Sequence, residues 1–265
     1  MRILKYLKKV FREKVYAWSL VIALLIFWEA SVRIMDLPGY FLPAPTDIIR
    51  KIMGNIPLLA MNTWVTLYEV LLGFALGIAI GVPLAILIVY VPILEKSVYS
   101  ILVSANAIPK VALAPILVVW LGFGLMPKLV VAFLICFFPI VVNTVIGMKS
   151  ISPEMIKLSR ILGASGWQQF FKFRLPQALP SIFGGLKIGV TLAVVGAIVG
   201  EYVAAERGLG YVQMVFAGNL DTAMVFAVLI ILSVMSVVLF NVVALIEKLT
   251  VRGNTEELTD CDTKL

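Results

Sequence analysis

The chain has 265 residues, of which 62% are hydrophobic and only 14% charged, and its mean hydropathy is +1.05. A soluble domain carries roughly 45–50% apolar and about 25% charged residues, so this composition excludes an ordinary soluble domain. The net charge of +7 comes from basic residues that lie between apolar runs, not from a basic domain with interleaved aromatic residues, so nucleic acid is not expected as a partner. The prediction is one all-α integral membrane domain.

Several chemistries are excluded by residue type. The chain has no histidine, and its two cysteines, Cys136 and Cys261, are too far apart in sequence to form a motif. An intramembrane enzyme of the paired-acid type would need two aspartates one helical turn apart, and the sequence has no such pair. We therefore expect no metal site, no cofactor bound by this chain and no catalytic residue.

The N-terminal residues 1–15 have a helical pattern of apolar and basic side chains, which predicts an amphipathic interfacial helix on anionic headgroups. A cleaved signal peptide is the competing interpretation. Trp28, Glu29 and Arg33 stand where a small-residue cleavage site would be needed, which disfavours it. Residues 16–62 are then a first transmembrane helix and an external loop.

Apolar runs of about 20 residues, the length that crosses a bilayer, recur along the chain. The third is interrupted by Asn106, Pro109, Lys110 and Pro115. We predict six spans, near residues 16–36, 64–91, 98–121, 126–148, 179–204 and 222–247.

The orientation follows from Lys and Arg outside the spans, because these are retained in cytoplasmic segments. With a cytoplasmic N-terminus, fifteen lie in inside segments and five in outside segments. Both termini are therefore expected in the cytoplasm, including the polar tail 251–265. The outside loop 36–62 is expected to hold turns and a short helix.

Glycines recur at intervals of four in the second and fifth spans, namely Gly73, Gly77 and Gly81, Gly185 with Gly189, and Gly196 with Gly200. Such stripes allow close helix approach in membranes. Among ionisable residues, Glu29 and Glu69 fit helix-packing or interfacial groups, and Lys187 fits a side chain that reaches the headgroups.

Residues 149–178 are more polar than their surroundings. Ser152, Pro153 and Glu154 are a helix start, and Gly163 is a helix stop. A second short helix is predicted from Ser165 to about Phe173, closed by Pro176. The segment is either a loop on the headgroups or a docking element for a cytoplasmic partner.

Within this segment, Gly163 and the run Phe173-Arg174-Leu175-Pro176 have the spacing of the EAA loop in permeases of binding-protein-dependent ABC importers. The longer pattern of Leu162-Gly163-Ala164-Ser165, Trp167, Leu175-Pro176 and Ala178-Leu179-Pro180 resembles the branch that imports nitrate, sulfonates, taurine, bicarbonate and some vitamin precursors. So do Ile108–Pro115 and Gly208-Leu209-Gly210-Tyr211. The chain departs from the motif at Lys157, Leu158 and Ser159, where Glu-Ala-Ala is usual, and Glu154 stands one turn earlier.

The resemblance implies a type I ABC importer permease, a MetI-like bundle with a cytoplasmic coupling helix, in a prokaryotic inner membrane. Its core is 63–250 and its EAA-like coupling loop 149–180. Implied partners are ABC ATPase subunits that hold ATP and Mg, an extracytoplasmic substrate-binding protein, and a second permease copy, identical or paralogous. The chain itself has no G-x-x-x-x-G-K-[ST] phosphate loop.

The residues expected to couple to the ATPase are Glu154, Lys157, Leu158, Gly163, Ala164, Ser165, Trp167, Leu175 and Pro176. Polar or helix-breaking residues within spans are candidates for the translocation pathway, namely Asn106, Pro109, Lys110, Asn143 and Glu201. For Glu201 the alternative is a structural pair with a basic side chain, and for Lys110 it is a side chain that reaches the headgroups. A small anion is the expected substrate, with a vitamin precursor such as a pyrimidine or riboflavin as the alternative. An ATP-independent carrier or channel is the competing class.

Overall fold

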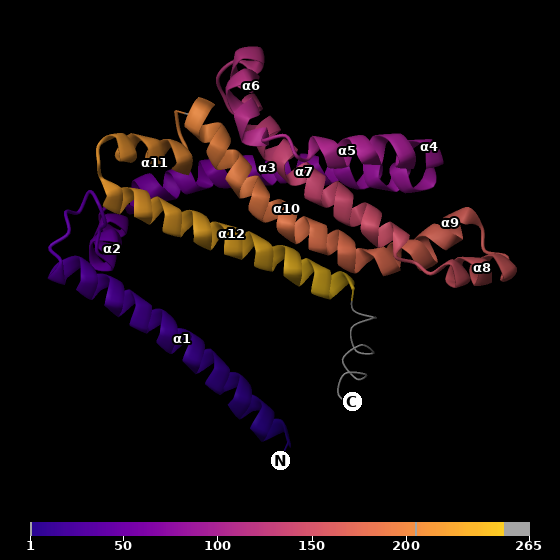
Figure 1. The fold of residues 1–265 in the computed structure, drawn as a ribbon, viewed down its shortest axis with the longest axis horizontal. Helices are drawn as coiled ribbons and strands as arrows, with labels where there is room; N and C mark the ends of the chain where they lie inside the picture. The colour runs from indigo at the N-terminus through magenta and orange to yellow at the C-terminus, as the bar shows by residue number, and fades with distance from the viewer. Residues whose placement is uncertain (1, 205, 252–265) are drawn as a thin grey trace. The chain divides into compact units, whose positions relative to one another are not determined.

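The computed structural model describes residues 2–204 and 206–251, and every regular element in these ranges is helical. The longer helices are α1 Arg2–Ile34, α2 Pro45–Gly54, α3 Ile56–Tyr90, α7 Leu125–Lys149, α8 Pro153–Ile161, α10 Leu175–Ala204, α11 Leu209–Gly218 and α12 Thr222–Thr250 (Figure 1). The shorter ones are α4 Pro92–Leu94, α5 Ser100–Ala105, α6 Ala114–Leu121 and α9 Gly166–Gln169. Two π-helical turns, η1 Glu95–Tyr99 and η3 Phe170–Arg174, and a 3-10 turn, η2 Lys110–Leu113, join them.

Four helical stretches among the described residues are long and apolar enough to cross a membrane: Ile56–Tyr90, Leu125–Lys149, Gly166–Ala204 and Thr222–Thr250. They coincide with the second, fourth, fifth and sixth predicted spans. The all-α membrane fold class is thereby confirmed. The second span begins earlier than expected, at Ile56, because only Asn55 separates α3 from the predicted short outer helix, α2.

The first predicted span lies in α1, which is one continuous helix from Arg2. The expected interfacial segment therefore enters the span without a break, while its side chains before Tyr16 lie outside the description. Leu20, Ile26 and Phe27 are exposed on this helix. A bilayer would cover such apolar side chains.

The predicted third span at 98–121 is not one continuous helix, and it breaks where its sequence predicted an interruption. Helix α5 ends at Ala105, residues 106–109 are not helical, and the chain resumes helical structure at Lys110. Pro109 is the physical reason, because it has no N–H for the helical hydrogen bond and constrains the residue before it. Lys110 then closes the end of α5: its Nζ donates to the Asn106 backbone oxygen at 2.9 Å and to Asn106 Oδ1 at 2.6 Å.

The chain divides into two compact units, Met61–Tyr211 with Ile231–Leu265, and Met1–Ala60 with Val212–Ile230. In the smaller unit, Glu29 accepts hydrogen bonds from Arg33 at 2.6 Å and from the Thr46 hydroxyl at 2.9 Å. Lys51 pairs with Asp221 at 2.5 Å. These contacts join α1 and α2, and tie α2 to the start of α12.

In the larger unit, α7 packs against both α3 and α10, and glycines of both helices approach the same residues of α7, Ala132 and Ile140. A Cβ added at Gly77 would lie 2.7 Å from Cys136 Sγ, and one added at Gly196 would lie 2.6 Å from the Ala132 Cα. Only glycine permits such close approach. The predicted packing role of the glycine stripes is confirmed where α7 contacts α3 and where it contacts α10.

Candidate functional site

The first helix of the polar segment forms as its sequence predicts. The Ser152 hydroxyl accepts a hydrogen bond from the Met155 N–H at 3.3 Å, and Pro153 occupies the first helical position. At the other end, Gly163 has a φ of 72°, where a side chain would be strained. Gly163 N–H donates to the Arg160 carbonyl and Ala164 N–H to the Ser159 carbonyl, both at 3.0 Å, which is the Schellman arrangement.

The second helix starts with a capping box, a feature that was not predicted from the sequence. The Ser165 N–H donates to Gln168 Oε1 at 2.9 Å, and the Gln168 N–H donates to Ser165 Oγ at 3.3 Å. The signal was the Ser-x-x-Gln spacing. The turn between α8 and α9 is thus closed by hydrogen bonds on both sides, so the two helices hold a defined angle.

The prediction that Pro176 closes the second helix is wrong. Helical structure runs without a break from Gly166 through the π-turn η3 into α10. In η3 the Leu175 N–H donates to the Phe170 carbonyl, five residues back. This π-helical turn lies immediately before Pro176. Without it, the ring of Pro176 and its missing N–H would disrupt a regular helix.

Aromatic side chains fasten the segment to the end of α3. The Phe170 ring meets the Tyr90 ring edge-on at 6.0 Å, and the Arg174 guanidinium lies over Tyr90 at 5.1 Å. Trp167 stacks on Phe171 at 5.2 Å. The segment is therefore connected to α7 and α10 by the chain itself, and it packs on α3 through contacts with Tyr90.

The proposed coupling residues divide by exposure. Glu154, Lys157, Leu158, Gly163, Ser165, Trp167 and Pro176 are exposed, while Ala164 and Leu175 are partly buried. Two further exposed side chains, Ile161 at 82% and Leu162 at 71%, lie beside them. The structure thus brings the predicted residues together in one element with an exposed apolar surface.

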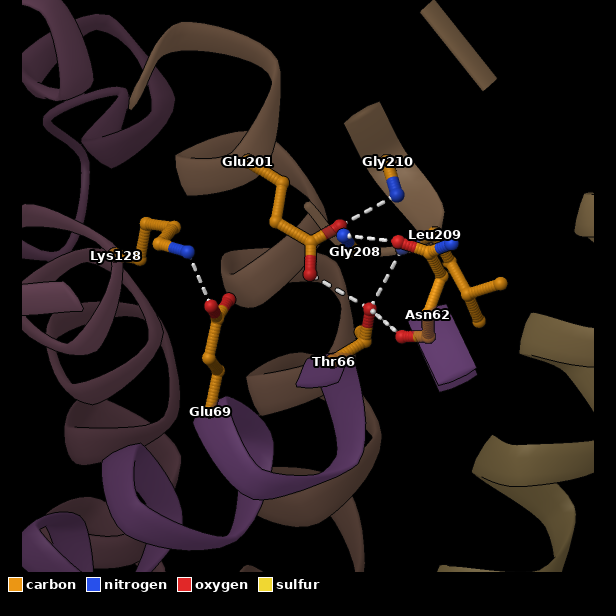
Figure 2. Close-up of polar contacts among 8 residues, drawn as sticks. All are labelled: Asn62, Thr66, Glu69, Lys128, Glu201, Gly208, Leu209 and Gly210. Carbon is orange, nitrogen blue, oxygen red and sulfur yellow. Dashed lines mark hydrogen bonds and ion pairs between the residues drawn. The ribbon is translucent and has the colours of Figure 1, made fainter. Parts of the chain in front are cut away.

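The second polar cluster was only partly anticipated. Figure 2 shows Glu201 at its centre, with its carboxylate accepting hydrogen bonds from the Thr66 hydroxyl at 2.6 Å and the Gly210 N–H at 2.5 Å. The Leu209 N–H donates to Thr66 Oγ1 at 2.8 Å. Glu201 is fully buried, and the hydrogen bonds that it accepts among the described residues come from a hydroxyl and a backbone N–H.

A buried ion pair lies beside Glu201. Lys128 of α7 pairs with Glu69 of α3, and both side chains are buried (Figure 2). Sequence reasoning assigned Glu69 to helix packing, which agrees with this contact, but treated Lys128 only as an outside charge. Two opposite charges in neighbouring apolar runs were the available signal. Lys187, expected to reach the headgroups, instead pairs with Glu247 at 2.8 Å.

The remaining pathway candidates lie in two places. Asn106, Pro109 and Lys110 form the break after α5, and Lys110 Nζ also lies 4.4 Å from the Phe138 ring centroid. Asn143 lies where α7 packs on α10, with its amide donating to the Pro139 carbonyl at 2.8 Å. The structure does not gather these residues with Glu201 into one cluster, so a shared pathway role stays a prediction.

Comparison with known proteins identifies the family of this chain. Residues 73–252 match the model described as binding-protein-dependent transport system inner membrane component. The chain is 37% identical over 231 residues to the riboflavin transport system permease protein RibX of Chloroflexus aurantiacus, covering 86% of each chain. It is 38% identical over 227 residues to the formylaminopyrimidine transport permease protein ThiX of Halalkalibacterium halodurans, covering 85% of this chain and 90% of that one.

Another relative is named for taurine. The Escherichia coli taurine transport system permease protein TauC is 26% identical over 228 residues, which cover 83% of this chain and 82% of that one. Among solved structures, an inward-facing form of the MetNI methionine ABC transporter aligns with a TM-score of 0.65 at 24% identity, covering 74% of this chain and 97% of that chain. The family resemblance read from the motifs is confirmed: this chain belongs to the inner membrane components of binding-protein-dependent transport systems, and is an ABC transporter permease.

Proposed function

We propose that this permease forms the translocation pathway of an importer and that residues 152–176 receive its ATPase. The observation that carries the proposal is the exposed apolar surface of α8 and α9 on an element fixed at both ends. An exposed apolar patch of this kind is a site for another protein. Because α8 follows α7 directly and η3 continues into α10, a partner that moves this element also moves two packed helices.

Trp167→Ala tests the coupling role, because Trp167 is 74% exposed and its loss removes docking surface without opening a core cavity. We expect less ATPase bound to membranes and a loss of solute-stimulated ATP hydrolysis. The matched control is Trp64→Ala, which removes an equally exposed indole, 71%, from α3. Equal ATPase recovery and coupling in the two variants would refute the assignment.

The pathway itself is proposed to run past the break after α5. Asn106 and Lys110 present an amide and an ammonium at a point where the backbone leaves the helix, and non-helical backbone at membrane depth occurs where it borders protein or water. Asn143 of α7 and Glu201 of α10 are the further residues proposed to line it. Pro109 sets the break. Asn106→Leu should lower uptake while leaving ATPase assembly unchanged.

For the substrate, we propose a nitrogen heterocycle of the riboflavin or pyrimidine type. The support is that the relatives named for riboflavin and formylaminopyrimidine are 37% and 38% identical, against 26% for the relative named for taurine. A small sulfonate is the second candidate. Uptake of labelled riboflavin, a pyrimidine and taurine by the complex reconstituted with its ATPase and binding protein separates them. Equal uptake without the ATPase would favour an independent carrier.

The assembly is proposed to contain two ATPases, a substrate-binding protein outside, and a second permease copy, identical or paralogous. The two termini are proposed to be cytoplasmic. Cys261 tests this, although it lies outside the described residues, because the other cysteine, Cys136, is fully buried and shielded from reagents. An impermeant thiol reagent should label opened but not intact cells. Labelling of intact cells that disappears in Cys261→Ser would reverse the orientation.

A further inference from the structure

An apolar pocket lies between the end of α3 and the segment that contains α9. It has a volume of about 640 Å³ and is lined by Pro83, Ile86, Leu87, Tyr90, Gly166, Trp167, Phe170 and Phe171. Nearly all of its lining atoms are carbon, so it offers a ligand apolar contact and little hydrogen bonding. A ligand that fits is a hydrocarbon chain.

The pocket continues a face of α3 that is exposed along the span. Leu76, Ile80, Pro83, Leu87 and Tyr90 are all exposed and recur at intervals of three and four, so they form one stripe. The first two precede the pocket and the last three line it. A lipid whose acyl chain contacts Leu76 and Ile80 therefore has a continuous apolar route into the pocket.

The segment that forms one wall of the pocket is basic. Residues 149–176 contain five basic side chains, Lys149, Lys157, Arg160, Lys172 and Arg174, against one acid, Glu154, and Lys149 pairs with Glu95 outside the segment at 2.7 Å. Arg174 is held beside the pocket, because its guanidinium stacks on Tyr90, a lining residue. A guanidinium at the mouth of an apolar crevice matches a phosphate attached to a hydrocarbon chain.

We propose that this pocket binds an acyl chain of an anionic phospholipid, with its headgroup phosphate at Arg174. The bound lipid fills the space between α3 and α9. It therefore supports the angle at which α8 and α9 project, because the pocket wall includes Trp167 of α9 and Phe171 of the adjoining turn η3. The anion preference comes from Arg174, and the chain affinity from Leu87 and the aromatic wall.

The test uses Trp167 as the reporter in the purified full-length chain. The other four tryptophans, Trp18, Trp28, Trp64 and Trp120, are replaced by phenylalanine, and the chain is placed in bilayers containing phosphatidylglycerol or phosphatidylcholine brominated on the acyl chains. If that variant does not fold, the difference in quenching between the natural chain and Trp167→Phe measures the same quantity. Half-maximal quenching is expected at a mole fraction of brominated phosphatidylglycerol about five times lower than that of phosphatidylcholine.

Three variants separate the parts of the proposal. Leu87→Phe fills the pocket and should reduce quenching by both lipids. Arg174→Gln should remove the preference for phosphatidylglycerol and keep the quenching by phosphatidylcholine. Lys248→Gln, a charge loss at an exposed position near the end of α12, should leave the preference intact. Equal quenching by the two lipids in the parent chain, or unchanged quenching in Leu87→Phe, overturns the proposal.

Discussion

Glu201 accepts a hydrogen bond from the backbone N–H of Gly210 at 2.5 Å, so a carboxylate near the end of α10 holds the first turn of α11. Thr66 extends this contact to α3, because its hydroxyl donates to Glu201 and accepts from the Leu209 N–H. Buried hydrogen bonds to a carboxylate are stronger than neutral ones. The turn between α10 and α11 is therefore fixed to two helices of the larger unit.

Gly208→Ala should destabilise this turn. A Cβ there would lie 2.2 Å from Glu201 Oε1, and Gly208 has a φ of +117°, which a side chain disfavours. The clash and the backbone strain together should lower the free energy of unfolding by about 2–4 kcal/mol, which lowers the thermal midpoint by roughly 5–10 °C. A thermal scan of the detergent-purified chain measures it. Gly218→Ala is the control, since a Cβ there meets nothing within 4 Å, and equal midpoints for the two variants would contradict the geometry.

Lys128→Met should be more damaging than an ordinary surface change. It leaves the Glu69 carboxylate buried without its cation, and removal of one partner from a buried pair costs about 3–5 kcal/mol. The Glu69 Oε2 atom already has no hydrogen-bond partner among the described residues. The thermal midpoint in detergent is the measurement.

The double variant Lys128→Met with Glu69→Met decides the cause of that loss. Replacing a buried ion pair by apolar side chains is often neutral, so most of the stability should return. The exposed Lys248→Met gives the cost of losing a lysine elsewhere. A double variant as unstable as Lys128→Met alone would show that packing, and not charge, sets the effect.

Features that depend on residues near in sequence were predicted well. Ser152, Pro153 and Gly163 bound α8 where expected, because capping and chain reversal are local properties. The glycine stripes also gave the correct packing faces. Their spacing requires a close neighbour but does not say which, so the contact of α7 with both α3 and α10 came only from the structure.

The errors arose where tertiary contacts or unusual hydrogen bonding override a local rule. Pro176 was expected to end a helix, but η3 changes the register just before it. The cluster around Glu201 joins it to Thr66, 135 residues earlier, and the sequence does not say which distant side chains the helices bring together. Lys187 illustrates the same limit, because its partner Glu247 lies on another span.

Gly163→Ala should strain the turn between α8 and α9 without creating a clash. The backbone φ of +72° costs a side chain about 1–2 kcal/mol, while the space beside Gly163 is open. We expect weaker ATPase binding with an almost unchanged thermal midpoint of the spans. Gly166→Ala is the matched control, because it lies in the same element, has open space and lacks a positive φ. Similar ATPase binding in both variants would show that the turn angle does not matter for docking.

Gly196→Ala and Gly184→Ala test the close packing of α10 against α7 within a single helix. The Cβ at residue 196 would lie 2.6 Å from the Ala132 Cα, a backbone atom that cannot rotate away, so α7 and α10 must separate. The Cβ at residue 184 meets nothing within 4 Å. Since alanine is favoured over glycine in a helix by about 1 kcal/mol, Gly184→Ala should keep or raise the thermal midpoint, while Gly196→Ala should lower it by several degrees. If Gly196→Ala is tolerated as well as Gly184→Ala, α7 and α10 do not make this contact in the membrane. Motion of the coupling segment would then reach α10 through η3 alone, without support from its packing on α7.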